Sequence, residues 1–289
     1  MSVRSGRAWL AAPALAMLTI GLVLPMVLIF VDSFRLRGVY GGYAPIEDLR
    51  AYLSSFDFLN NYENAVKPVY LAIFWRSLKL AVVSTLACLF VGYPMAWWMA
   101  MSIRPSLRSL ALVLIIIPFW SSFVVRTFAW VWILRTEGLI NAALMGLGII
   151  HEPLPLLYNE GAVLVGLVYT ELPFMVLPIY ASLEKLDRTL LEAAADLGAT
   201  PLEAFRRVAL PLSMPGVAAG ALLVFVPAVG QYIISDMLGG AKSMLVGNLI
   251  RNQFFGGKNA PFGFALSFLL MVLVLALLRV WPSDEEEAR

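Results

Sequence analysis

The sequence predicts an all-α integral membrane protein with about six transmembrane helices. Of its 289 residues, 61% are hydrophobic and 14% are charged, whereas soluble domains carry about 25% charged residues. The mean hydropathy is +0.82. Apolar runs long enough to cross a bilayer, about 20 residues each, recur along the chain. Much of the molecular surface is therefore expected to face lipid rather than water.

Six apolar segments are long enough to span a bilayer as helices. They cover residues 8–31, 80–103, 109–134, 161–183, 212–235 and 260–281. The first follows Arg4 and Arg7 as a signal peptide would, but the run is too long and no small-residue cleavage site follows it, so we expect a retained helix. The chain contains neither a repeat nor a low-complexity linker, which predicts one membrane domain over residues 1–289.

Prolines fall inside several of these spans, at positions 118, 173, 178 and 227. Proline is tolerated in membrane helices where neighbouring groups satisfy the freed carbonyls, so we expect kinks at these positions. The stretch 139–150 is apolar but too short to span a bilayer, which predicts a re-entrant or interfacial segment.

The composition excludes several classes of function. Cys88 and His151 are the only cysteine and histidine, which excludes a disulfide framework, most zinc sites and a His-paired catalytic site within this chain. A net charge of +2 makes nucleic acid an unexpected partner. The sequence has no Gly-x-x-x-x-Gly-Lys-[Ser/Thr] phosphate loop, so no cofactor is expected in this chain, and energy for transport must come from an ATPase subunit or an ion gradient.

The polar loop over residues 184–211 carries nine charges between Glu184 and Arg207. Two successive sequences there fit the capping box, in which a hydroxyl and a glutamate three residues later satisfy the first helical amides. They begin at Thr189 and at Thr200, and Gly198 between them is suited to end the first helix. The loop is therefore predicted to form a helix, a glycine turn and a second helix at the membrane surface.

This loop resembles the EAA loop of ABC-importer permeases. The resemblance rests on Glu192-Ala193-Ala194, on Gly198 and on Val208-Ala209-Leu210-Pro211, placed between the fourth and fifth apolar spans. It implies the type I, MetI-like permease fold and a cytoplasmic loop that docks into an ATPase subunit. By this resemblance the ATPase-coupling residues are Glu192, Ala193, Ala194, Asp196 and Gly198.

Further segments resemble the spermidine/putrescine permease group in particular. They are Gly92-Tyr93-Pro94, Ile117-Pro118-Phe119-Trp120, Arg126-Thr127-Phe128-Ala129-Trp130, Leu172 to Pro178, Leu183 to Asp187 and Val224 to Gly230. Gln231 departs from the group, in which an acidic residue is common at this place. The resemblance implies a polyamine as solute, and permeases for iron, sulfate or another organic amine stay open as alternatives.

The resemblance also implies partners and a location. The expected partners are ATP-binding cassette subunits that hold ATP and magnesium, a second and different permease subunit, and an extracytoplasmic solute-binding protein. The expected location is the bacterial cytoplasmic membrane, with many spans and both termini in the cytoplasm. The distribution of Lys and Arg alone does not settle this orientation, although Arg104 and Arg108 in a short connection without acids favour it.

Ionisable groups inside spans are costly and so are candidates for function. Glu171 in the fourth span is expected to face the solute pathway, with Asp236 and Gln231 near the end of the fifth. The aromatic candidates for cation–π contacts with an ammonium group are Trp120, Tyr169 and Tyr232. In the alternative interpretation, Glu171 forms a structural ion pair with Arg126 of the third span.

Two other classes of protein compete with the importer subunit. A gradient-driven secondary transporter accounts for the spans and for Glu171, but not for the two capped helices of the loop. An integral membrane enzyme has little support, because the spans contain no cluster of polar catalytic residues.

Overall fold

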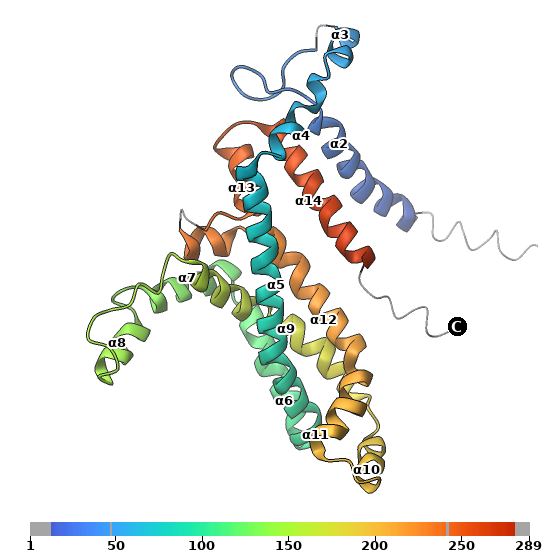
Figure 1. Ribbon diagram of the computed structural model, residues 1–289, viewed down its shortest axis with the longest axis vertical. Helices are drawn as coiled ribbons and strands as arrows, with labels where there is room; N and C mark the ends of the chain where they lie inside the picture. Colours follow the sequence, from blue (N-terminus) through green and yellow to red (C-terminus); the bar gives the residue numbers. More distant parts are fainter. Residues whose placement is uncertain (1–12, 47, 241–242, 281–289) are drawn as a thin grey trace, which may run out of the picture. The chain divides into compact units, whose positions relative to one another are not determined.

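A computed structural model describes residues 13–46, 48–240 and 243–280. These residues form helices, and the one β-bridge among them joins Arg37 to Tyr43. The α-helices are α2 (Leu24–Ser33), α3 (Leu49–Ser54), α4 (Asn60–Ala65), α5 (Pro68–Trp97), α6 (Pro105–Ile116), α7 (Phe123–Leu134), α8 (Leu139–Gly146), α9 (Glu160–Glu184), α10 (Arg188–Asp196), α11 (Pro201–Ala204), α12 (Leu210–Gly230), α13 (Val246–Phe255) and α14 (Ala260–Val280) (Figure 1). Shorter π- or 3-10 segments are η1 (Thr19–Val23), η2 (Asp57–Leu59), η3 (Trp98–Ser102), η4 (Ile117–Trp120), η5 (Phe205–Ala209) and η6 (Ser235–Gly239).

The described chain divides into two compact units. The first contains residues up to 72 together with 249–282, and the second contains residues 73–248. In the first unit α2 packs against α14, with the rings of Phe30 and Phe268 4.9 Å apart. The turn after α2 is fixed by Asn61, whose Nδ2 donates to the carbonyls of Ser33 at 2.9 Å and Arg35 at 2.8 Å.

The second unit is built on the contact between α9 and α12, to which α5 adds a third helix. Close approach depends on glycines: a Cβ on Gly216 of α12 would lie 2.5 Å from the carbonyl oxygen of Pro178 in α9. A Cβ on Gly92 of α5 would lie 3.2 Å from side-chain carbons of both Met175 and Val176 in α9. Small residues at such contacts let membrane helices pack by van der Waals forces.

The predicted span over residues 109–134 is wrong as one continuous helix. Pro105–Trp120 and Phe123–Gly146 meet at an angle of 91°. Ser121 and Ser122 have extended backbones at the break, and the Ser121 hydroxyl donates to the Pro118 carbonyl at 2.7 Å. Proline lacks an amide donor, so the backbone hydrogen bonds of the helix are interrupted here. The Ser121 hydroxyl donates to a carbonyl near the interruption.

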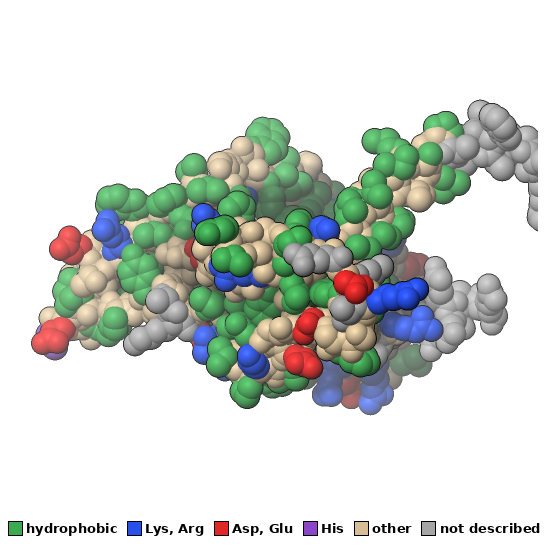
Figure 2. All heavy atoms as spheres, turned by 90° about the horizontal axis from the view of Figure 1, so that it is seen from above, with side chains coloured by type: hydrophobic (Ala, Val, Ile, Leu, Met, Phe, Trp, Pro, Cys, Tyr) green, Lys and Arg blue, Asp and Glu red, His purple; other side chains and the backbone are tan. Residues whose placement is uncertain are grey.

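Five helices among the described residues are long and apolar enough to cross a membrane, and the bent pair makes a sixth if it is one span. The five are Pro13–Ser33, Pro68–Ser102, Glu160–Glu184, Pro201–Gly230 and Ala260–Arg279. The expectation of an all-α protein with about six spans is confirmed. Positions 8–12 and 281 of the predicted first and last spans lie outside the described residues. The end of the molecule that is seen in Figure 2 carries hydrophobic side chains intermixed with Lys, Arg, Asp and Glu.

Of the span boundaries that differ from the predicted ones, two differ for identifiable reasons. The second span begins at Pro68 rather than at residue 80, because the helix continues past the charged Arg76 and Lys79. The fifth ends at Gly230 rather than at residue 235, because Gln231 is extended and its Oε1 accepts the amides of Tyr232 at 2.9 Å and Ile233 at 3.1 Å.

Replacing Gly216 with alanine is expected to destabilise the packing of α9 on α12. The added methyl would lie 2.5 Å from both the Pro178 carbonyl and the Ser182 hydroxyl, and overpacking of this kind costs about 1–3 kcal/mol. The apparent Tm of the detergent-solubilised protein should fall. Gly230→Ala is the matched control, because the same helix has open space there. Equal Tm values for the two variants would contradict this account.

Candidate functional site

The first helix of the polar loop, α10, begins on a different cap from the one the sequence suggested. Asp187 is the N-cap, and its Oδ1 accepts the Thr189 amide at 3.0 Å. The predicted capping box from Thr189 to Glu192 is therefore wrong. The Asp187 carboxylate accepts a hydrogen bond from a first-turn amide that has no partner within the helix. The helix therefore begins at Arg188, and Thr189 lies inside it.

The second predicted capping box is confirmed. The Thr200 hydroxyl accepts the Glu203 amide at 3.3 Å, and Glu203 Oε2 accepts the Thr200 amide at 2.9 Å. Pro201 occupies the first helical position of α11. Gly198 has a φ of +86°, a left-handed conformation that favours glycine, so the predicted glycine turn between the two helices is also present.

The loop presents a surface with a hollow beside its first helix. Glu192, Ala193 and Asp196 are exposed and Ala194 is half-buried. Leu197 is 89% exposed, and Leu190 and Leu202 of the same loop are 46% and 64% exposed. The hollow measures about 300 Å³ and is lined by Ala194, Leu197, Gly198, Ala199, Glu203, Ala204, Arg207 and Val208. An exposed apolar side chain beside a hollow of mixed polarity is suited to a protein partner.

Two arginines tie the loop to the end of the second span. Arg188 of α10 donates from Nη2 to the Ala100 carbonyl at 2.9 Å, and Arg108 of α6 donates to the same oxygen at 2.8 Å. Ala100 lies in the π-helical segment η3, where carbonyls at a helix C-terminus lack intrahelical partners and favour cations. The sequence analysis missed this contact, because the spacing of Ala100 and Arg188 carries no local signal.

An aromatic contact makes a second connection between the loop and α5. The ring of Phe205 in η5 meets the ring of Tyr93 at 5.6 Å and the ring of Trp97 at 5.3 Å, both edge to face. The Tyr93 hydroxyl lies 2.8 Å from the hydroxyl of Ser213 in α12. Both ends of the loop are therefore held against the same helix.

Glu171 is buried in α9 without a partner among the described residues. Its residue is 4% exposed, and its Oε2 has no hydrogen bond within this part of the chain. One turn earlier, the thiol of Cys88 in α5 lies 3.7 Å from the Val168 carbonyl. A buried carboxylate is costly unless a cation or a hydrogen-bond donor meets it or it takes up a proton.

The ion pair between Glu171 and Arg126 is absent from the described residues, and that prediction is wrong. The Arg126 guanidinium instead lies over the ring of Phe119, 4.7 Å from its centroid. Its Nε and Nη1 are buried without hydrogen-bond partners in the described chain. The bend at Ser121 explains the difference, because Arg126 is on α7 after the bend rather than on a straight third span.

The other predicted pathway residues fall into three places. Gln231, Tyr232 and Asp236 lie together after α12, where Asn248 donates from Nδ2 to Asp236 Oδ1 and, at 3.1 Å, to the Tyr232 carbonyl. Tyr169 is on α9, with its ring 5.5 Å from that of Trp130. Trp120 is 86% exposed at the bend.

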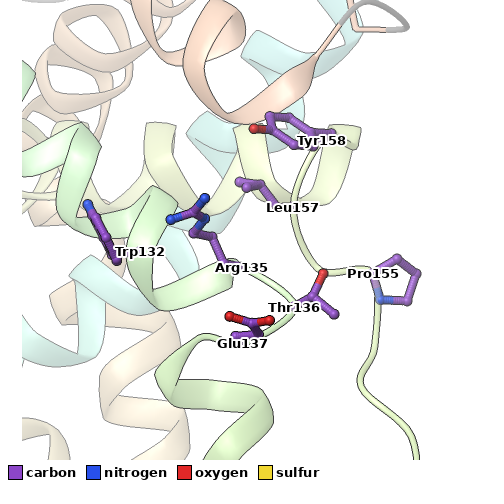
Figure 3. A pocket seen from close by; sticks show the side chains of 7 residues that line it. All are labelled: Trp132, Arg135, Thr136, Glu137, Pro155, Leu157 and Tyr158. Atoms are coloured by element: carbon purple, nitrogen blue, oxygen red, sulfur yellow. The ribbon is translucent and has the colours of Figure 1, made fainter.

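A pocket that the sequence did not indicate lies between the end of α7 and the segment before α9. Its volume is about 540 Å³, and its lining residues are Trp132, Arg135, Thr136, Glu137, Pro155, Leu157 and Tyr158. Figure 3 shows Trp132, Arg135 and Glu137 on one side and Pro155 and Tyr158 on the opposite segment. The Arg135 guanidinium lies 4.9 Å from the centroid of the Trp132 ring. Charges of both signs line the pocket, which gives it no net preference for a cation or an anion.

The chain is similar to membrane components of import systems. The family described as binding-protein-dependent transport system inner membrane component matches residues 92–281. The spermidine/putrescine transport system permease protein PotB of Escherichia coli (strain K12) is 42% identical over 262 residues, which cover 90% of this chain and 91% of that protein.

Solved transporters have the same fold. A chain of the bacterial ABC transporter involved in the import of the acidic polysaccharide alginate has a TM-score of 0.67 at 16% identity, covering 94% of this chain and 93% of that one. A chain of the MetNI methionine ABC transporter in inward-facing conformations has a TM-score of 0.53 at 23% identity, covering 72% and 90%. The predicted type I, MetI-like permease fold is confirmed.

Low pH is expected to open the second capping box. The hydrogen bond from the Thr200 amide holds the pKa of Glu203 below its usual value of 4.5. Because the folded-state pKa is lowered, the box stabilises α11 above pH 4.5, and this contribution is lost as the pH falls through the lowered pKa. Amide exchange at Thr200 and Glu203, corrected for intrinsic rates, should therefore lose protection at acid pH. Glu203→Gln should remove the pH step, and parallel profiles for the two proteins would contradict this assignment.

Proposed function

We propose, from the premise that this chain belongs to the family of binding-protein-dependent transport system inner membrane components, that it forms half of a translocation pathway for a polyamine. Family membership makes the chain a transporter subunit rather than an enzyme. It is a permease of an ABC importer in the bacterial inner membrane, and a gradient-driven transporter working alone is not retained. The solute is assigned as spermidine or putrescine from the 42% identity to a permease of that name.

The observation that carries the mechanism is the exposed loop formed by α10, Gly198 and α11. In our proposal α10 docks into an ATPase subunit, with Glu192, Ala193 and Asp196 on the contact surface and Leu197 beside the hollow. ATP and magnesium are held by that subunit. Closure of the ATPase pair pulls on α10, and the Arg188 contact at Ala100 passes the displacement to the second span.

The remaining partners follow from the same family. A second, different permease subunit completes the pathway, and an extracytoplasmic binding protein delivers the solute on the face opposite the loop. We place both termini in the cytoplasm, the side of the coupling loop. In this arrangement residues 1–289 act as one permease domain.

For the solute itself we assign the central role to Glu171. Its buried carboxylate lacks a partner among the described residues, and an ammonium group of a polyamine would neutralise it. Gln231, Tyr232 and Asp236 form a second polar group after α12. Tyr169 and Trp120 are the proposed aromatic contacts, since the face of an aromatic ring attracts an ammonium.

The coupling role predicts a strict requirement at Gly198. The φ of +86° strains any β-branched residue, although nothing lies within 4 Å of the added Cβ. Gly198→Val should lower ATP-dependent polyamine uptake by about tenfold or more, measured in cells that express the complete transport system. Gly198→Asn should retain most uptake, because asparagine tolerates this conformation. If valine and asparagine behave alike, the backbone at this turn does not determine coupling.

The pathway role predicts a specific effect of Glu171→Gln. Loss of the charge should raise the KM for spermidine by about tenfold, equivalent to about 1.4 kcal/mol of binding, while membrane expression stays unchanged. Glu152→Gln is the control, because Glu152 is an exposed loop carboxylate. Lost expression of the Glu171 variant, or an unchanged KM, would contradict the assignment.

A further inference from the structure

A groove runs between α5 and α9 at the ends of these helices that lie away from the coupling loop. Its volume is about 170 Å³, and it is lined by Arg76, Lys79, Leu80, Val83, Glu160, Gly161 and Leu164. All of these residues belong to the second compact unit. The transport role assigns no task to this α5–α9 groove.

Helix geometry places the mouth of the groove at the membrane surface. From Arg76 to Ala100 the chain is helical, and 24 residues at 1.5 Å each give a rise of about 36 Å. The Ala100 carbonyl is tied to the coupling loop by Arg188. The hydrocarbon layer of a bilayer is about 30 Å thick. Arg76 therefore reaches the headgroup region of the leaflet opposite the loop.

The other wall of the groove, α9, has its charged end at the same distance from the coupling loop as Arg76 of α5. In α9, 24 residues separate Glu160 from Glu184 at the coupling-loop end, again a rise of about 36 Å. Glu160 Oε1 and Arg76 Nε are 3.3 Å apart, which confirms that the two helices present their charged ends at one level.

Polarity changes along the groove in the direction of the membrane normal. Arg76, Lys79 and Glu160 surround the mouth, while Leu80, Val83 and Leu164 lie deeper along the two helices. Beyond them the surface of α5 stays apolar, with Leu86 59% and Phe90 83% exposed. A charged mouth above an apolar track matches a phospholipid, whose headgroup is polar and whose acyl chain is not.

The charge at the mouth selects among headgroups. Two cations and one carboxylate leave a net charge of +1, and the carboxylate is already paired with Arg76. A second ammonium, as in a zwitterionic headgroup, would add to the positive charge. A phosphodiester whose headgroup carries no other charge would neutralise it.

We propose that the α5–α9 groove binds an anionic phospholipid of the phosphatidylglycerol type. The phosphate lies between Lys79 and Arg76, and one acyl chain follows Leu80 and Val83 toward Phe90. Such a lipid holds the outer ends of α5 and α9 together, the two helices that meet the coupling loop at their other ends.

Native mass spectrometry of the purified, complete transporter complex tests the proposal. The complex is loaded with equal amounts of phosphatidylglycerol and phosphatidylcholine of identical acyl chains and then partly delipidated. We expect the wild type to retain about fivefold more phosphatidylglycerol. Lys79→Gln should lose most of this preference, and Lys79→Arg should keep it. Lys185→Gln, at the loop end of α9, is the matched control and should keep it too.

Three results would overturn the proposal. One is equal retention of both lipids by the wild type. Another is an equal loss for Lys79→Gln and Lys185→Gln, which would indicate general surface charge. The third is a disulfide between Lys79→Cys and a cysteine placed on the second permease chain, which would assign the groove to that chain. Lys79 is exposed, so its substitution is not expected to prevent folding.

Discussion

A bilayer core offers no water to the backbone, so every amide and carbonyl inside it must find a partner within the protein. This requirement determines where the helices of this chain can stop. At the end of the second span, Arg108 and Arg188 donate to one carbonyl, that of Ala100. After α12, the Gln231 side chain accepts two amides of the following turn. The places where the chain departs from a straight helix are thus the places where polar side chains concentrate.

The sequence predicted much of the fold because hydropathy reports directly on this requirement. Runs of apolar residues locate the helices well, and the fourth span differs from the predicted one by a single residue at each end. Pro118 predicted a kink in the third span, but not a break of 91°. Its hydropathy is continuous, and the break depends on two extended serines and a proline whose conformations no periodicity reveals.

For the candidate site, local chemistry was predictable and long-range pairing was not. The capping box at Thr200 and the turn at Gly198 depend on residues adjacent in the sequence. The predicted N-cap of α10 was two residues too late. Both Asp187 and Thr189 are suitable N-cap residues, and it is the Asp187 carboxylate that accepts the amide hydrogen bond. The pairing of Arg126 with Glu171 assumed that charges in neighbouring spans meet, which the bend before α7 prevents.

In the proposed coupling, the close packing of α9 on α12 is what would let a docked loop act on the membrane. These two helices flank the loop on either side. At Gly216 the backbone of α12 lies so close to α9 that another methyl group has no room, and at Gly220 a Cβ would lie 3.0 Å from the Met175 sulfur. A force applied to α10 therefore cannot separate them, because interiors packed at this density resist deformation. The pair must move together, and α5 moves with it through the Phe205 contacts and the Ala100 carbonyl. Glu171 lies near the middle of α9, so its carboxylate moves together with this rigid body.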